Sequence, residues 1–415
     1  MNPEQIAASQ TGDIRRLVSH RETVQAADTL EAVHGHFSRH VHEFMAVLDG
    51  DKLIGLCARR QIGMILGARF GFAINSRKPI RELMLPACTQ ISVTEPLPEI
   101  LRKVFTRPDD VLFDDVLLVD ESGAFLGVVF VRTLVRLQQS LLQQNITELN
   151  HKNAELENDL RLASEIQLAL LPQQYPQCPV ENNCVAFHHH YLPSGVVSGD
   201  FFHVFTISRH KVGVFICDVM GHGVRSAFVT AMLRTLVQEL GHLGENPGEL
   251  LTRVNCELKA ILKQTGDLVY ATGFYLILDV QTGSIRYAKA GHPDPLCLRR
   301  ATGTVTPLAC PAATRGAALG LFEGSRYGTA ENHVAPGDIL FFLTDGLSEI
   351  FNVEGEEFGE KQLAAAIRSR ASQPLKKLMD GVVNEALEFS PERRFSDDVC
   401  FLGMEILQLD NSAAK

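Results

Sequence analysis

The stretch ICDVMGHGVRSAF, Ile216–Phe228, decides the fold of the second half of the chain. An apolar run ends on the carboxylate Asp218, the chain passes through two glycines, and a helical pattern of apolar residues follows. Gly221 and Gly223 permit a close turn because neither carries a Cβ. The pattern predicts a buried strand before Asp218, a tight turn, and a helix over 224–240 that packs back on a sheet.

Four phrases in this part of the chain are interpreted as strand-like runs that end on aspartate. A single aspartate at such a place is typical of a turn, but four of them suggest a shared purpose. Hard divalent cations such as Mg²⁺ and Mn²⁺ prefer oxygen ligands, and strand ends hold ligands rigidly. The phrases are SGDFFHVF with Asp200, FICDVMGHG with Asp218, ILFFLTDGLSEI with Asp345, and RFSDDVCFLGMEI with Asp397 and Asp398. They predict a metal site at one edge of a sheet.

Length and composition restrict the possible classes of protein. A chain of 415 residues is expected to form two or more domains, and 45% apolar with 21% charged residues is typical of globular proteins. The net charge of −10 argues against a nucleic-acid-binding protein. No run of 18 apolar residues predicts a membrane span. Nine cysteines without a CxxC pair, and a polar start over Met1–Arg16, predict a cytoplasmic protein with reduced thiols.

A heptad pattern runs from Leu142 to Leu170, where apolar residues recur at alternating steps of four and three. Pro172 then supplies a stop signal for the helix. Asn153 and Gln167 fall at a positions, where a buried Asn favours a parallel dimer in fixed register. The pattern predicts a dimeric coiled coil, and the alternative is one amphipathic helix packed on its own domain.

Two segments before this helix share one plan: a helix, an apolar strand, a turn, a second strand and another helix. The phrases FMAVLDGDKLIGLCARRQIGMIL and DVLLVDESGAFLGVVFVRTLVRL carry the paired strands. The turns at Asp49-Gly50 and Glu121-Ser122-Gly123 are those that hairpins require. The sequence therefore predicts an internal repeat.

This repeat resembles a tandem pair of cystathionine-beta-synthase (CBS) domains over about residues 20–138. The resemblance implies an adenine nucleotide whose ribose is held by a Thr or Ser and an Asp after the second strand. The matching positions here are Ala58 and Gln61 in the first copy, and Phe130 and Thr133 in the second. Because both copies lack the ribose pair, a dimerising module without a ligand is the alternative.

The order of phrases after residue 155 resembles the metal-dependent protein phosphatases (PPM, or type 2C), in the bacterial branch that regulates sigma-factor partner switching. These phrases include ASEIQLALLPQQYP, CDVMGHG, LTDGLSE and SDDV. The resemblance covers about residues 155–408 and implies an αββα sandwich. The whole chain is therefore expected to be an α+β protein.

Within this resemblance, Asp218 would bridge two Mn²⁺ or Mg²⁺ ions, and the carbonyl of Val219 would be a further ligand. Asp345 and Asp397 would complete the shell of one ion, with Asp398 as the alternative to Asp397. The bound metals would supply a hydroxide that attacks phosphoserine or phosphothreonine.

Asp200 would serve the other ion, directly or through a water molecule. Three positions near the motifs depart from the family pattern: Ser198-Gly199 replaces a double glycine, His203 replaces an Asp, and Cys400 replaces a Thr or Ser. They leave the principal ligands in place but weaken the expected site for the second ion. His222 is interpreted as a solvated turn residue, with a metal ligand or proton donor as the alternative.

The implied substrate is a phosphorylated anti-sigma-factor antagonist, supplied by another chain. The alternatives are a pseudophosphatase that only binds the phosphoprotein, and a metal-dependent hydrolase of small phosphoesters. The predicted organisation has a dimeric sensor that gates the phosphatase through the linker helix. Its parts are an N-terminal tail 1–19, a CBS-like sensor and dimerisation module 20–138, a coiled-coil linker 139–171, a phosphatase domain 172–408 and a C-terminal tail 409–415.

Overall fold

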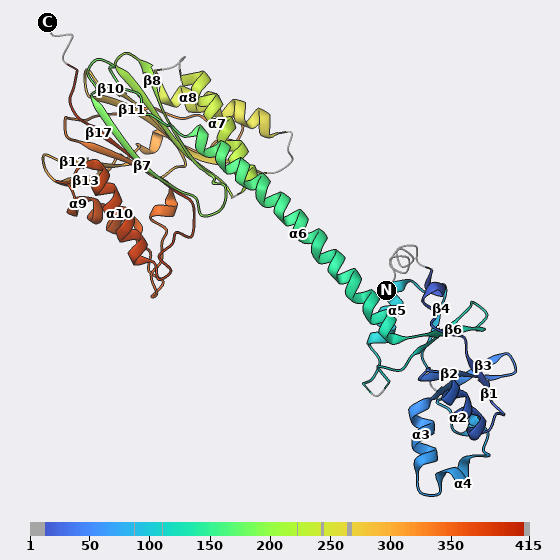
Figure 1. Ribbon diagram of the computed structural model, residues 1–415. Helices are drawn as coiled ribbons and strands as arrows, with labels where there is room; N and C mark the ends of the chain where they lie inside the picture. Colours follow the sequence, from blue (N-terminus) through green and yellow to red (C-terminus); the bar gives the residue numbers. More distant parts are fainter. Residues whose placement is uncertain are drawn as a thin grey trace. The chain divides into compact units, whose positions relative to one another are not determined.

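The computed structural model describes residues 13–86, 88–109, 111–221, 223–241, 245–263 and 268–410. The chain divides into two compact units, Met1–Asn153 and Ala154–Lys415, which we call the N-terminal and C-terminal units (Figure 1). His222 and the outer parts of both predicted tails lie outside the described residues. None of the helices that the structure describes combines the length and the apolar character needed to cross a membrane.

The N-terminal unit contains the predicted repeat. In each copy the first strand pairs in parallel with the second, which pairs antiparallel with the third. The first copy comprises β1 (Thr23–Gln25), α2 (Leu30–Arg39), β2 (Phe44–Asp49), β3 (Lys52–Ala58) and α3 (Arg59–Gly67), followed by α4 (Gly71–Asn75). The second comprises β4 (Gln90–Ser92), α5 (Leu97–Phe105), β5 (Val116–Val119), β6 (Phe125–Val129) and the start of α6. Gly50 and Gly123 occupy the predicted turns with positive φ.

The described part of this unit begins at residue 13, before the predicted boundary at residue 20. A short 3₁₀ helix, η1 (Ile14–Leu17), precedes β1. Ile14 and Leu17 are both buried and pack with the apolar side chains of β4, β5, β6 and α5. Because these two side chains complete the core of the second copy, the segment from residue 13 belongs to the unit and not to a tail.

The helix α6 (Val131–Leu170) is longer than the predicted linker, which began at residue 139. Its first turns, with Leu134 and Leu137, are buried in the N-terminal unit. The backbone N–H of Val131 donates to Asp115 Oδ1 at 3.0 Å. The helix ends just before Pro172, as predicted.

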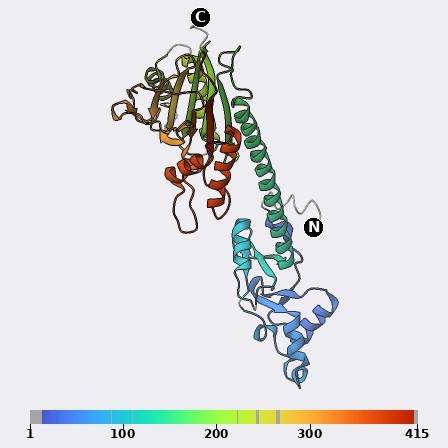
Figure 2. The same cartoon turned by 90° about the vertical axis from the view of Figure 1, so that its left-hand side faces the viewer.

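The C-terminal unit is an αββα sandwich, as predicted (Figure 2). One sheet has the order β14-β11-β10-β9-β8, with β15 also on β11, and the other has the order β13-β12-β16-β17-β7. The strands of the first sheet are β8 (Asp200–Ser208), β9 (Lys211–Val219), β10 (Ala271–Asp279), β11 (Ser284–Ala290), β14 (Arg315–Gly316) and β15 (Ala330–His333). Those of the second are β7 (Val185–Leu192), β12 (Leu296–Arg299), β13 (Thr304–Pro307), β16 (Ile339–Leu343) and β17 (Val399–Ile406).

Two helix pairs cover the outer faces of the sandwich. The pair α7 (Val224–Gly241) and α8 (Pro247–Leu262) packs on the first sheet, and α9 (Gly359–Ser369) and α10 (Leu375–Phe389) pack on the second. Side chains between the two sheets and under α7 and α8 form one core, and those under α9 and α10 form another. This layering explains why the apolar run before Asp218 is buried on both faces.

Candidate metal centre

The predicted aspartates meet at one edge of the sandwich because neighbouring strands are antiparallel. Asp200, the first residue of β8, pairs directly with Asp218 near the end of β9. In the second sheet, Asp345 follows the end of β16 and Asp397 precedes the start of β17, and these two strands are paired. The sequence interpretation was therefore wrong in one respect. Asp200 and Asp397 lie at the starts of strands, which an antiparallel sheet places beside the ends of their neighbours.

Two glycines allow the chain segments at this edge to approach closely. A Cβ on Gly199 would lie 2.7 Å from the carbonyl oxygen of Val219, and a Cβ on Gly346 would lie 2.0 Å from that of Asp398. Both contacts are with backbone atoms, which cannot move aside easily. Glycine at these positions therefore keeps the Asp200 segment against β9 and the Asp345 turn against the Asp397-Asp398 segment.

Burial and neighbouring negative charges raise the pKa of two carboxylates at this edge, Asp218 and Asp345. Burial, followed by the charges of Asp345, Asp397, Asp398 and Glu349 in that order, raises the pKa of Asp218 to about 7. Burial and the charge of Asp397 also raise the pKa of Asp345. Mutual repulsion among partly buried carboxylates is a cost that a divalent cation between them would offset.

Asp200 is the most deeply buried of the predicted carboxylate ligands, with an exposed fraction of 2%. Burial raises its pKa well above the usual range, and the charge of Asp218 adds to this effect. The hydroxyl of Thr344 donates to Asp200 Oδ2 at 2.6 Å and so supports the ionised form. One oxygen of Asp200 is therefore engaged inside the protein.

The two adjacent aspartates have different surroundings. Asp398 is buried, and its carboxylate accepts from the backbone N–H of Ser194 at 2.7 Å, the hydroxyl of Ser194 at 2.9 Å and the N–H of Gly199 at 2.7 Å. Asp397 is exposed, and its Oδ1 accepts from the N–H of Asp398 at 2.7 Å. Asp398 therefore connects its own segment to those of Ser194 and Gly199 by hydrogen bonds. Asp397 makes fewer such bonds and is the better candidate ligand.

A pocket of about 350 Å³ lies beside these carboxylates. Its lining contains Asp218 and Asp345, together with Glu349, Glu357 and Glu360, which the sequence analysis did not select. Glu349 was within reach of the sequence, since it lies in the phrase LTDGLSE. Glu357 and Glu360 follow no strand-like run, and only the folded chain brings them to the pocket.

The wall of the same pocket contains the buried His292, whose Nδ1 lies 2.8 Å from the hydroxyl of Thr272. Burial lowers the pKa of His292 to about 3, so that the imidazole is neutral near neutral pH. His292 is therefore a neutral part of the wall beside Asp218.

The carboxylates are spread more widely than the shell of one ion. No three of these carboxylates have oxygen atoms that all lie within 4.8 Å of one another. Among the described residues, the three side chains whose ligand atoms do lie this close together are on β7 and α10. Two-metal centres hold their ions roughly 3.5–4 Å apart and share a bridging carboxylate. The donors are all oxygens, which hard divalent cations prefer, and the charges of Asp345, Asp397 and Asp398 act on Asp218.

Gln167 of α6 has a role that the heptad pattern did not predict. It is buried, with an exposed fraction of 3%, and its amide makes two hydrogen bonds to the backbone of Ser198. Nε2 donates to the carbonyl of Ser198 at 2.7 Å, and Oε1 accepts from its N–H at 2.9 Å. The prediction that Gln167 continues the seam of a dimer was wrong, because the last turns of α6 pack on the C-terminal unit.

Comparison with known proteins agrees with this geometry. Residues 208–407 match the family model described as stage II sporulation protein E. The phosphoserine phosphatase RsbP of Bacillus subtilis is 25% identical over 249 residues, which are 60% of this chain and 58% of that protein. The phosphoserine phosphatase RsbU of the same organism is 24% identical over 196 residues, which are 47% of this chain and 55% of that protein. The chain thus spans just over half the length of these relatives.

A solved structure supports the fold. The SiaA-PP2C domain of Pseudomonas aeruginosa superposes with a TM-score of 0.52 at 23% identity, covering 61% of this chain and 98% of that domain. Its match, the family model and the αββα layers all concern the same half of the molecule. The C-terminal half of this chain therefore has the PP2C phosphatase fold, and residues 208–407 within it are similar to stage II sporulation protein E.

Proposed function

We propose that this protein is a divalent-metal-dependent serine/threonine protein phosphatase, gated by its N-terminal unit. The observation that carries the proposal is the position of Asp218. It pairs with Asp200 across β8 and β9, and its pKa is raised by the charges of Asp345 and Asp397 from the other sheet. Carboxylates from both sheets thus surround one point at the edge of the sandwich.

Asp218 would bridge two Mn²⁺ or Mg²⁺ ions, with the carbonyl of Val219 beside it. Asp345 and Asp397 would complete one shell, and Asp200 would serve the other ion, directly or through water. When bound, the two ions would lower the pKa of a shared water molecule, so that hydroxide is available near neutral pH.

The chain's own contribution is to hold these ligands in place. Asp398 ties the Ser194 and Gly199 segments to the start of β17, which fixes the backbone on either side of Asp397 and Asp200. Because ligand positions must be kept within fractions of an ångström, such supporting contacts matter nearly as much as the ligands.

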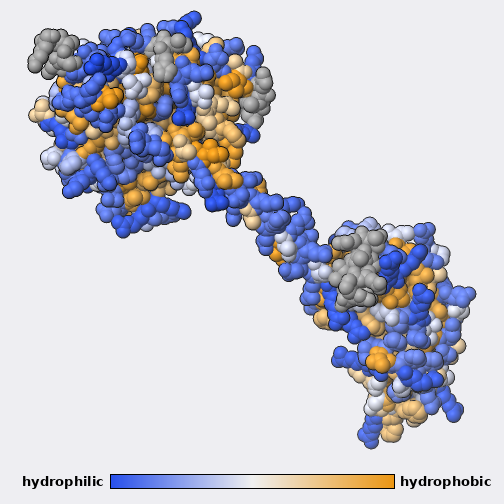
Figure 3. All heavy atoms as spheres, turned by 45° about the horizontal axis from the view of Figure 1, so that its top comes forward, coloured by the Kyte–Doolittle hydropathy of each residue, from blue (hydrophilic) through white to orange (hydrophobic). Residues whose placement is uncertain are grey.

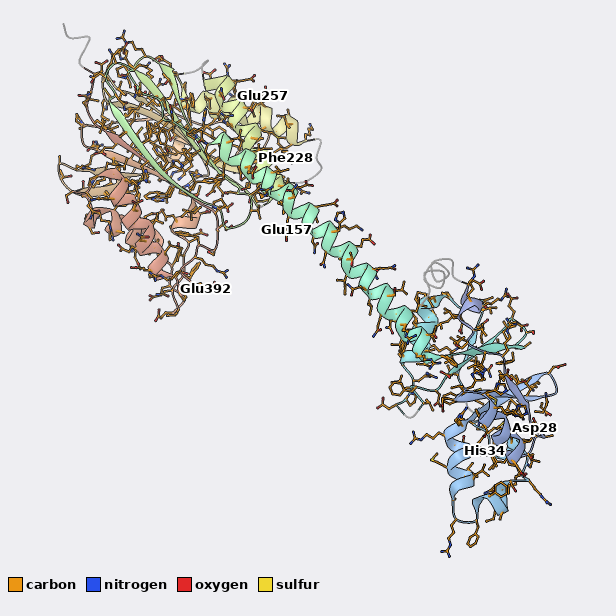
Figure 4. All side chains as sticks on the ribbon, viewed as in Figure 1. Asp28, His34, Glu157, Phe228, Glu257 and Glu392 are labelled. Atoms are coloured by element: carbon orange, nitrogen blue, oxygen red, sulfur yellow. The ribbon has the colours of Figure 1, made fainter. Side chains whose placement is uncertain are left out.

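A second cavity supports a protein as the substrate. A groove of about 850 Å³ runs beside the carboxylates and is lined by Val196, Phe351 and Arg394, among others. Its lining also includes Gly223, from the glycine turn, and Ser396, which directly precedes Asp397. Figure 4 labels Glu392 on the loop after α10 that forms one side of this groove. A mixed apolar and charged groove of this size suits a folded protein better than a small phosphoester.

The substrate that best fits this reading is a phosphorylated anti-sigma-factor antagonist with one phosphoserine or phosphothreonine. The likeness to RsbP and RsbU supports this choice, since both are phosphoserine phosphatases. A pseudophosphatase is the weaker alternative, because Asp200, Asp218, Asp345 and Asp397 are all present at the site.

The exposed seam of α6 supports a homodimer. Leu142, Ile146, Leu149 and Leu156 recur at heptad spacing, and each has an exposed fraction between 50% and 61%. Figure 3 shows further apolar surface on the C-terminal unit, and Phe228 of α7 is 64% exposed there. A parallel coiled coil with a second copy would bury the seam.

The N-terminal unit is proposed to act as a CBS-like dimerisation and sensor module. One ribose position in each copy makes a contact within the chain: Gln61 Nε2 donates to the carbonyl of Leu83 at 3.1 Å, and the guanidinium of Arg132 stacks over Phe130 at 4.2 Å. These contacts favour dimerisation without a nucleotide at the usual place. A change in α6 would reach the metal centre through Gln167 and Ser198.

The first test is Mn²⁺-dependent release of phosphate from p-nitrophenyl phosphate and from a phosphoserine peptide by the full chain. Asp218→Asn should abolish both activities, whereas Asp279→Asn, at the opposite end of β10, should retain them. If Asp218→Asn retains both activities, the proposal that Asp218 binds the metal ions is refuted. Peptide binding without turnover would support the pseudophosphatase, and turnover of the small ester alone would support the small-phosphoester hydrolase.

Gating is tested by comparing the full chain with residues 154–415, a fragment that keeps Gln167. Equal turnover by the two would remove the claim that the N-terminal unit controls the phosphatase.

A further inference from the structure

Three consecutive histidines in β7 point to alternate sides of the second sheet. His189 faces the interior of the sandwich, where its Nδ1 lies 2.5 Å from the hydroxyl of Tyr175 and its ring contacts Phe202. Since side chains alternate along a strand, His188 and His190 face the other side, on which α10 lies (Figure 1).

The side chain of Asp380 on α10 meets these two histidines. Its Oδ1 lies 3.0 Å from Nε2 of His190 and 3.8 Å from Nε2 of His188. One ligand atom from each of the three residues lies within 4.8 Å of the others.

A glycine in β17 makes this meeting possible. Gly403 pairs directly with His188, and a Cβ at Gly403 would lie 2.6 Å from the sulfur of Met379 and 2.8 Å from Leu375 Cδ1. Without a side chain at residue 403, α10 packs directly against the sheet and brings Asp380 over β7. The three side chains are thus positioned by a strand and a helix rather than by mobile loops.

The two Nε2 atoms of this cluster face one carboxylate oxygen. Nε2 of His188 and Nε2 of His190 are buried, and Oδ1 of Asp380 lies 3.8 Å from the first and 3.0 Å from the second. Buried polar atoms in native proteins are nearly always paired with protein, water or an ion. Burial also lowers the pKa of both histidines, which favours the neutral imidazole that binds metal ions.

We propose that His188, His190 and Asp380 bind a Zn²⁺ ion, at a site separate from the carboxylate centre. Two imidazoles and one carboxylate, with a fourth position for water, are a common set of zinc ligands. Two ligand atoms that each lie about 2.0–2.1 Å from a tetrahedral ion are about 3.3 Å from each other. This distance lies between the two distances from Asp380 Oδ1 to the histidine nitrogens, 3.0 and 3.8 Å.

The charges around the site distinguish it from the carboxylate centre. It offers one carboxylate and two imidazole nitrogens, which favour a transition metal over Mg²⁺. The ammonium of Lys376, one turn before Asp380 on α10, opposes a cation, since its charge lowers the pKa of both histidines. A strongly bound Zn²⁺ tolerates this charge better than a weakly held ion does.

The expected consequence is a link between β7 and α10. β7 is an edge strand of the second sheet, which pairs with β17 on one side and packs against α10 on one face. Because the unfolded chain does not hold the three ligands together, Zn²⁺ should stabilise the C-terminal unit against heat.

The test uses the full-length Asp218→Asn protein, in which the carboxylate centre is impaired. Added Co²⁺, which substitutes for Zn²⁺, should give the visible absorption of a tetrahedral site at one ion per chain, and Zn²⁺ should displace it. Zn²⁺ should also raise the melting temperature. His190→Gln and Asp380→Asn, each in the same background, should remove the spectrum and the shift, whereas the exposed His333→Gln should keep both.

Absence of a tetrahedral spectrum in the parent protein would overturn the proposal. An unchanged spectrum in both His190→Gln and Asp380→Asn would overturn it as well, because the ion would then lie elsewhere. Circular dichroism of each variant confirms that it is folded. The spectrum does not depend on phosphatase activity, so that its loss and the failure of the proposed function are separate results.

Discussion

Gln167→Ala is expected to weaken the C-terminal unit and its proposed metal centre together. The substitution removes the two hydrogen bonds between the Gln167 amide and the backbone of Ser198, at 2.7 and 2.9 Å. Ser198 is 1% exposed, so that water cannot replace either partner without a rearrangement. The helix itself should be unaffected, because alanine has the highest helix propensity.

The magnitude follows from the groups left without partners. A buried N–H or C=O that loses its hydrogen bond costs about 1–3 kcal/mol, and some of this is recovered as the site relaxes. Two such groups predict a loss of about 2–4 kcal/mol in the free energy of unfolding of the C-terminal unit. Because the N–H of Asp200 donates to the hydroxyl of Ser198 at 3.0 Å, the affinity for Mn²⁺ should fall as well.

Urea unfolding followed by circular dichroism measures the stability, and hydrogen exchange of the peptide containing Ser198 locates the effect. Gln144→Ala, at an exposed position outside the heptad seam of the same helix, is the matched control and should change neither. Unchanged stability and unchanged exchange in Gln167→Ala would refute the link between α6 and the metal centre.

Three further predictions follow from single contacts. Asp398→Asn should lower the free energy of unfolding by about 2–4 kcal/mol, because the Asp398 carboxylate accepts three hydrogen bonds. Asp397→Asn should leave the free energy of unfolding unchanged and weaken Mn²⁺ binding. Calorimetry of both variants separates these outcomes. Gly346→Ala should lower the thermal midpoint strongly, since its Cβ would lie 2.0 Å from a backbone oxygen, and a midpoint equal to that of the parent would contradict the close contact. Burial, and after it the charge of His42, lowers the pKa of His20 to about 4. His20 therefore binds a proton below about pH 6.5 in the unfolded chain, but only near pH 4 in the folded unit. The stability of the N-terminal unit should therefore fall as the pH drops from about 6.5 to 4. His20→Gln should reduce this loss of stability. If urea titrations show the same dependence of stability on pH in His20→Gln as in the parent, the role of His20 is refuted.

Local sequence was enough to predict the main elements around the metal centre. The apolar run before Asp218, the two glycines and the helical pattern after them reappear as β9, a turn with positive φ at Gly221 and Gly223, and α7. Each depends on short-range preferences: burial, the freedom of glycine, and the spacing of apolar residues along a helix. The same applies to the hairpin turns of the N-terminal repeat and to the end of α6 before Pro172.

The tertiary structure decided which residues meet. Sequence could not separate Asp397 from Asp398, because the difference lies in the backbone amides of Ser194 and Gly199, far away in the chain. The heptad pattern likewise could not show that Gln167 turns toward Ser198, since an a position looks the same whether it faces a second copy or its own domain.

The cluster on β7 shows the same division. A run of three histidines fixes only that alternate side chains face opposite sides of a strand. The close packing of α10 on Gly403 selects the side that meets Asp380. Sequence by itself thus determined the helices and strands and indicated the carboxylates as candidate ligands, since both depend on near neighbours. Antiparallel register and helix packing, which depend on contacts between distant segments, decided the sites.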